Sequence, residues 1–97
     1  MTIEWTIDAL DDRGAIMTYL ELESPLAALN TDELIEAQIE RLRDFPDSGR
    51  PGRVDGTREL IISGTPYIAV YSTAQAGVRI LRVLHGARMW PGDTSGS

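Results

Sequence analysis

The stretch that decides the fold runs from Phe45 to Pro91 and reads FPDSGRPGRVDGTRELIISGTPYIAVYSTAQAGVRILRVLHGARMWP. It contains three apolar runs of strand length, near residues 57–63, 66–73 and 78–85. Ser63-Gly64 and Ala76-Gly77 lie in the two connections between them. A glycine in a short connection between two such runs is typical of a β-hairpin. The stretch therefore predicts three strands joined by two hairpin turns.

The residues before this stretch predict one more strand and two helices. Thr2 to Thr6 reads as a short strand, and Thr6 can cap a helix over residues 7–23. Ser24-Pro25 suits the start of a second helix, because serine is favoured at the N-cap and proline at the first helical position. That helix should reach about Asp44. The apolar stripes expected to face the sheet are Leu10, Ile16, Met17 and Leu20 in the first helix and Leu34, Ile35, Ile39 and Leu42 in the second.

The last of the three strands is apolar on both of its faces, which suits a central position in the sheet. Strict alternation along it would place Arg82 on the face of Ile80 and Leu84, and Arg79 on the opposite face. The fold class expected is α+β, with the order β-α-α-β-β-β. A mainly antiparallel sheet of four strands would carry a helical hairpin on one face. Residues 1–91 would form this single domain, and residues 92–97 a disordered tail.

Charge is distributed unevenly along the chain, whose net charge is −6. Twelve acids against three arginines lie up to Asp47, whereas three acids against six arginines follow Ser48. Such asymmetry indicates one surface that attracts anions and another that repels them, although two solvated helices beside an ordinary sheet would give the same pattern. No lysine is present. The loop residues Arg50 and Arg53 could present two cations to a phosphate or carboxylate, or simply form a solvated turn.

Several classes of protein are disfavoured by what the sequence lacks. No apolar run approaches the roughly 18 residues that a membrane-spanning helix needs. No metal-binding, phosphate-binding or dinucleotide-binding motif is present, so no metal and no cofactor are expected. A cytoplasmic protein is the default expectation. No complete pair of a general acid and a general base can be assigned. His85, the only histidine, and Glu59 are the weak candidates for such a pair. His85 could equally end a strand and bond locally.

Three phrases of the stretch resemble one known family, the ParE/RelE toxins of bacterial toxin–antitoxin pairs. They are FPDSGRPGRVDGTREL, GTPYIAVY and ILRVLHGARMWP, which follow one another in the family's order and cover about half the chain. The match is closer to the ParE branch, because no tyrosine or histidine follows the final RMW, where RelE-like toxins often keep a catalytic group. The resemblance implies a toxin that is neutralised by a ParD-like antitoxin and inhibits DNA gyrase by binding it. The alternatives are a RelE-type endoribonuclease that cuts mRNA on the ribosome, and an inactive homologue that binds only its antitoxin.

The positions of several residues on the expected strands and helices also suggest which of them meet partners. Contacts with the target are expected at Arg58, Arg82, Arg88 and Trp90. Contacts with the antitoxin are expected at Leu20, Leu42, Arg58 and Arg82. An arginine within an apolar strand can instead pair with an acid of its own chain. Neither a membrane nor a specific nucleic-acid sequence is expected to be bound, since the chain is acidic overall.

Overall fold

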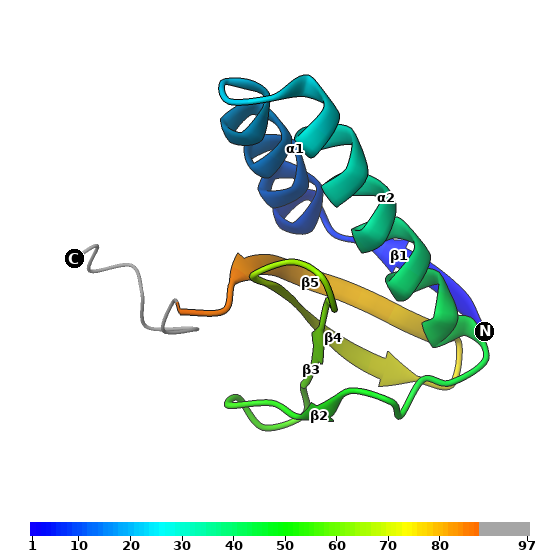
Figure 1. Cartoon of the computed structure of the whole chain (residues 1–97). Coiled ribbons are helices and arrows are strands. Elements are labelled where there is room, and N and C mark those ends of the chain that lie inside the picture. The colour runs from blue at the N-terminus through cyan, green and yellow to red at the C-terminus, as the bar shows by residue number, and fades with distance from the viewer. Residues whose placement is uncertain (88–97) are drawn as a thin grey trace.

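The computed structural model describes residues 1–87. Its elements follow one another as β1 (Thr2–Trp5), α1 (Ile7–Glu21), α2 (Pro25–Glu40), the 3₁₀ turn η1 (Arg41–Arg43), β2 (Arg50–Pro51), β3 (Arg58–Ile61), β4 (Tyr67–Ala74) and β5 (Gly77–His85). The two helices form a hairpin that lies on one side of the sheet (Figure 1). The expected tail, 92–97, lies outside the described residues.

The strands form one mixed sheet in the order β1-β5-β4-β3-β2. β1 runs parallel to β5, and the other neighbours are antiparallel. The expected α+β class and helical hairpin are confirmed, and β5 has strands on both sides as predicted. The expectation of four strands was wrong by one. β2 has only two residues, Arg50 and Pro51, in a stretch that reads as a loop, and it is a strand only because it pairs with β3.

Both helices begin where their capping residues predict. The Thr6 hydroxyl accepts a hydrogen bond from the Ala9 N–H at 3.1 Å, and the Ser24 hydroxyl accepts one from the Ala27 N–H at 3.1 Å. These bonds satisfy donors that have no partner inside the helix. The helices end slightly earlier than expected, at Glu21 and Glu40, and the second continues as the 3₁₀ turn.

The main core lies between the hairpin and one face of the sheet. Ile35, Ile39 and Leu42 from the second helix region pack there, as predicted. Leu10 and Leu34 do not, because they are 51% and 38% exposed. In α1 the fully buried position belongs to Ala9, with Ile16 and Leu20 partly buried against the core. Alanine at this position lets the helix backbone approach the sheet closely.

An ion-pair network joins the two helices, and we call it the hairpin network. Arg13 donates to Asp32 through Nε at 2.6 Å and Nη2 at 3.0 Å, and its Nη1 lies 2.8 Å from a Glu36 oxygen. The guanidinium also lies 4.9 Å from the ring centre of Trp5 on β1, a cation–π distance. One half-buried cation thus serves two carboxylates and ties the hairpin to the sheet.

β5 contains a bulge that breaks its side-chain alternation. Val70 pairs with Arg82 but Tyr71 pairs with Ile80, so Leu81 is the extra residue. Ile80 therefore packs in the helix-side core, whereas Leu84 joins Ile68 and Val70 in a second cluster on the opposite face. The prediction that Ile80 and Leu84 share a face was wrong, since strict alternation holds only for a regular strand. None of the helices within residues 1–87 is long and apolar enough to cross a membrane.

Candidate functional site at the arginine-rich edge of the sheet

The loop that precedes β3 is fixed to the sheet by the buried hydroxyl of Tyr71. This hydroxyl donates to the Pro46 carbonyl at 2.8 Å and accepts from the Gly49 N–H at 2.9 Å. Burial raises the pKa of Tyr71, so the phenol keeps its proton. Glycine is required at position 49, because a Cβ there would lie 2.6 Å from the Tyr71 oxygen and 3.0 Å from the Glu59 carbonyl. The loop therefore lies directly against β3 and β4.

Arg58 holds the same loop from β3. Its Nη1 donates to the Gly49 carbonyl at 2.7 Å and to the Asp47 carbonyl at 3.3 Å. Its Nε also lies 3.7 Å from the Asp47 carboxylate. The residue expected to contact both target and antitoxin therefore braces its own chain in this structure, and those contacts remain predictions.

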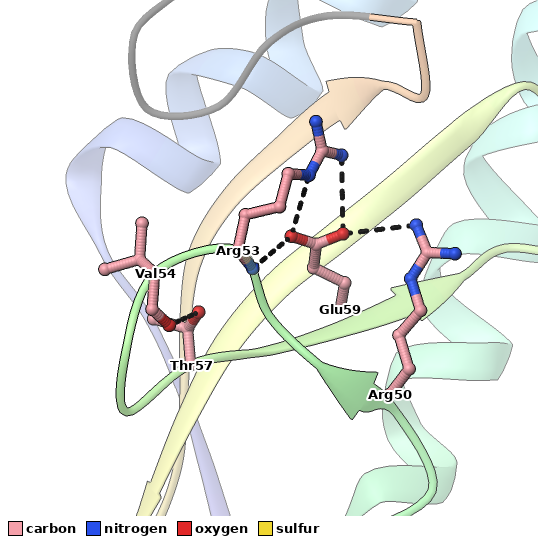
Figure 2. A network of polar contacts seen from close by, with 5 residues as sticks. All are labelled: Arg50, Arg53, Val54, Thr57 and Glu59. Carbon is pink, nitrogen blue, oxygen red and sulfur yellow. Dashed lines mark hydrogen bonds and ion pairs between the residues drawn. The ribbon is translucent and has the colours of Figure 1, made fainter.

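Glu59 forms the centre of the second ion-pair network, which we call the edge network (Figure 2). The residue is 2% exposed. One carboxylate oxygen accepts from the backbone N–H of Arg53 at 3.0 Å and from its Nε at 3.2 Å. The other accepts from Nη2 of Arg53 at 3.3 Å and of Arg50 at 3.2 Å. Figure 2 shows the two guanidinium groups approaching the carboxylate from different directions.

The chemistry of Glu59 follows from this surrounding. Burial by itself raises the pKa of the carboxyl, but the hydrogen bonds from Arg53 and Arg50 outweigh it, and the pKa of Glu59 is lowered. A carboxylate held in its ionised form by two cations is a poor proton acceptor. Both arginines keep partly exposed side chains, 55% for Arg50 and 39% for Arg53, so the network carries a net positive charge at the surface.

His85 does not approach Glu59. His85 lies opposite Tyr67 in the pairing of β4 with β5, and Tyr67 packs in the helix-side core. Glu59 lies opposite Val70, which packs in the cluster on the other face. Because paired residues project to the same side, the two candidates for proton transfer lie on opposite faces of the sheet. The His85 ring instead meets Tyr67 edge-on at 5.9 Å, and its Nδ1 accepts from the Ala87 N–H at 3.2 Å.

Arg82 is bound by an acid from the opposite half of the chain. Its Nε and Nη2 donate to the two oxygens of Asp12 on α1 at 2.7 and 3.0 Å. Asp12 also accepts from the Val83 N–H at 2.9 Å. The Asp12 carboxylate therefore ties α1 to the part of β5 that lies beyond the end of β1. The sequence did not decide this pairing, since Arg82 could equally have been left to contact a partner protein.

The remaining candidates differ in accessibility. Leu42 is completely buried in the core and Leu20 is partly buried against it, so neither offers much side-chain surface here. Arg88 and Trp90 lie outside the described residues. Reasoning from the sequence missed Phe45 and Ile61, which are 65% and 54% exposed beside the loop. The signal was weak: one aromatic residue opening a loop, and the first of two adjacent isoleucines.

Nothing in residues 1–87 resembles a metal site, since no group of three or more His, Cys, Asp or Glu side chains converges there. What the structure presents at the β3 side of the sheet is a fixed loop with two partly exposed arginines and nearby apolar side chains. Such a surface is suited to binding a partner that carries acidic groups, or both acidic and apolar groups, rather than to transferring protons.

Comparison with known proteins identifies the family of the chain. Residues 3–90 match the family described as ParE toxin of the type II toxin–antitoxin system parDE. The chain is 39% identical over 89 residues to "Putative toxin Y4kP" of Sinorhizobium fredii, covering 92% of each protein. It is 34% identical over 87 residues to "Toxin RelE2" of Caulobacter vibrioides, covering 90% of this chain and 97% of the relative.

A solved structure shows the same fold. It is described as the chromosomal ParDE toxin–antitoxin system from P. aeruginosa, and it superposes with a TM-score of 0.78 at 31% identity. The match covers 88% of this chain and 95% of the other. The match to the family over nearly the whole chain, the sequence relatives and the shared fold lead to one conclusion: this chain belongs to the ParE toxin family of type II toxin–antitoxin systems.

Proposed function

We propose that this toxin acts by binding DNA gyrase in the cytoplasm and that a ParD-like antitoxin neutralises it. The main support for action by binding, rather than by catalysis, is that His85 and Glu59 lie on opposite faces of the sheet. The carboxylate is also held ionised by two arginines. A general acid and base must both reach one substrate, and these two groups do not converge.

The choice of gyrase rests on the likeness to the ParE branch of the superfamily. The sequence ends its RMW phrase without the aromatic or imidazole group of RelE-like toxins. The acidic surface of the hairpin also suits a ribosome-bound nuclease poorly, because affinity for RNA depends mainly on cations. The target contacts proposed are Arg88 and Trp90, together with the exposed guanidinium groups of the edge network. Arg58 and Arg82 would contribute by fixing the loop and the end of β5.

The direct experiment is expression of the chain without its antitoxin from a tightly repressed promoter. Covalent gyrase–DNA cleavage complexes and cleavage of mRNA are measured in the same cells. We expect cleavage complexes to accumulate while mRNA stays intact, and co-expression of the neighbouring reading frame's product to restore growth. Cut mRNA without cleavage complexes would instead establish the endoribonuclease alternative.

The variant His85→Gln separates binding from catalysis. It removes the titratable group while keeping a similar polar shape, so toxicity should stay within a few-fold of the wild type. An endoribonuclease that used His85 would lose about 10²- to 10⁴-fold in rate. Growth inhibition is compared at matched low expression, and binding to the antitoxin serves as the check that the variant is folded. Loss of toxicity in a folded variant would end the gyrase proposal.

A further inference from the structure

Within residues 1–87, the outer edge of β3 is covered at both ends but open in the middle. At one end Arg50 pairs with Glu59, and the Gly52 N–H donates to the Thr57 carbonyl at 2.8 Å. At the other end the side-chain amide of Gln38, on α2, replaces a neighbouring strand. It donates to the Ser63 carbonyl at 2.9 Å and accepts from the Ser63 N–H at 2.8 Å. Ile61 lies between these two covered positions.

The backbone groups of Ile61 are directed to the open side. The Ile62 N–H donates to the Tyr67 carbonyl at 3.0 Å, so even-numbered residues of β3 bond toward β4 and odd-numbered residues bond outward. No group in residues 1–87 hydrogen-bonds the N–H or C=O of Ile61 on that side. Continuing the register of β2 would bring Ser48 opposite Ile61, but the Ser48 N–H bonds to the Phe45 carbonyl at 3.1 Å instead. β2 is thus a short edge strand that ends before the position opposite Ile61.

The surroundings of this gap define the chemistry of what would fill it. Two adjoining hollows meet at Ser48, Leu60 and Ile61. The exposed side chain of Phe45 lines one of them and that of Ile61 lines both. Arg50 lines one hollow and Arg41 the other. Of the lining residues only Glu59 is acidic, and it is already paired with two arginines. The gap is therefore apolar with a cation at each end.

We propose that an extended segment of the antitoxin, carrying an apolar residue flanked by acids, adds to β3 at Ile61 in line with β2. Main-chain bonds to Ile61 would give affinity, and the Phe45 and arginine contacts would select the sequence. A second copy of this chain is a poor occupant, because a two-fold edge-to-edge contact at Ile61 would place Arg50 of each copy against Arg41 of the other. The proposal rests on the proposed function only in requiring an antitoxin.

The first test uses unmodified protein. Amide hydrogen exchange is measured for each residue of the separately purified toxin, alone and with the product of the neighbouring reading frame. The Ile61 amide should exchange quickly in the free toxin and at least about tenfold more slowly in the complex. The Leu60 amide should change much less, because it already lies in the β3–β4 ladder. An Ile61 amide that stays as fast in the complex as in the free toxin would overturn the proposal.

The second test removes the outward N–H together with the isoleucine side chain. Ile61→Pro should be tolerated by the free fold, since proline is compatible with an edge position whose N–H faces solvent. It should weaken binding to the antitoxin about 5- to 50-fold, whereas Ile61→Ala, which also loses the isoleucine side chain but keeps the N–H, should weaken binding clearly less. Equal binding by both variants would contradict the added strand. An antitoxin that fails to bind wild-type toxin would instead contradict the proposed function, so the two failures are distinguishable. If Ile61→Pro does not fold, the exchange measurement decides alone.

Discussion

The hairpin network and the edge network both pair arginines with carboxylates, but in inverse proportion. In the hairpin one cation, Arg13, is shared by two acids, and at the sheet edge one acid, Glu59, is shared by two arginines. In each case the shared group is the more buried one, and the outer groups keep contact with water. The networks therefore leave opposite charge at the surface, negative over the helices and positive beside β3. The uneven charge of the sequence becomes two surfaces of opposite sign in the fold.

The comparison predicts that the networks fail differently when their outer groups are removed. Replacing both Arg50 and Arg53 by methionine leaves the Glu59 carboxylate buried without a cation. Breaking a buried pair in this way typically costs about 3–5 kcal/mol. Urea unfolding at neutral pH should show a loss of that size. Arg41→Met serves as the matched control, because it removes an exposed arginine from η1 and should change the free energy of unfolding by less than about 0.5 kcal/mol. A double variant as stable as this control would show that the carboxylate is not effectively buried.

Glu59→Gln should have a smaller, pH-dependent effect. The amide keeps an acceptor for the Arg53 N–H but loses the charge, and hydrogen bonds to charged groups contribute about 1.5–3 kcal/mol. Because the pKa of Glu59 is lowered in the folded state, its stabilisation is complete above the ordinary glutamate value of about 4.3. It is lost as the pH falls below that value and through the lowered pKa of the folded state. The difference between wild type and variant should therefore shrink in acid, which urea unfolding at several pH values would reveal. A constant difference would contradict the shift.

Arg13→Met should destabilise less than the double change at the edge. The variant loses the pairing with Asp32 and Glu36 and the contact with Trp5, yet both acids are partly exposed and regain water. We expect a loss of about 1–2 kcal/mol, combining a charged hydrogen bond with a cation–π contact. Thermal unfolding provides the measurement. Arg79→Met is the control, because Arg79 pairs with Glu4 on the surface and such pairs contribute about 0–1 kcal/mol.

The smallest effect expected is a gain. Gly14 lies within α1, and a Cβ added there would meet nothing within 4 Å. Gly14→Ala should therefore raise stability by about 0.5–1 kcal/mol, since glycine costs that much in a helix interior. The same change at Gly49 should be destabilising, because its Cβ would overlap the Tyr71 hydroxyl beside the edge network. Opposite signs for the two alanines in thermal unfolding would confirm that only the loop glycine is required by packing.

Parts of the fold were predictable because they depend on neighbours in the chain. Thr6 and Ser24-Pro25 marked the helix starts, and the caps were found there. The two glycine-containing turns marked the hairpins between β3, β4 and β5. The bulge at Leu81 and the short strand Arg50–Pro51 were not predictable in this way, since each exists only in relation to a partner strand.

The features of the candidate site also separate into those that the sequence determined and those that depend on distant segments of the chain. By itself the sequence determined the family, the fold class, and the residue types available: many arginines, a single histidine and no lysine. Only the tertiary structure decided that Arg82 meets Asp12, seventy positions away, and that His85 and Glu59 lie on opposite faces. It also decided that no group within residues 1–87 pairs with the outer backbone groups of Ile61. Caps and turns are satisfied within a few residues, whereas the pairing of charges, faces and edges depends on which distant segments the folded sheet brings together.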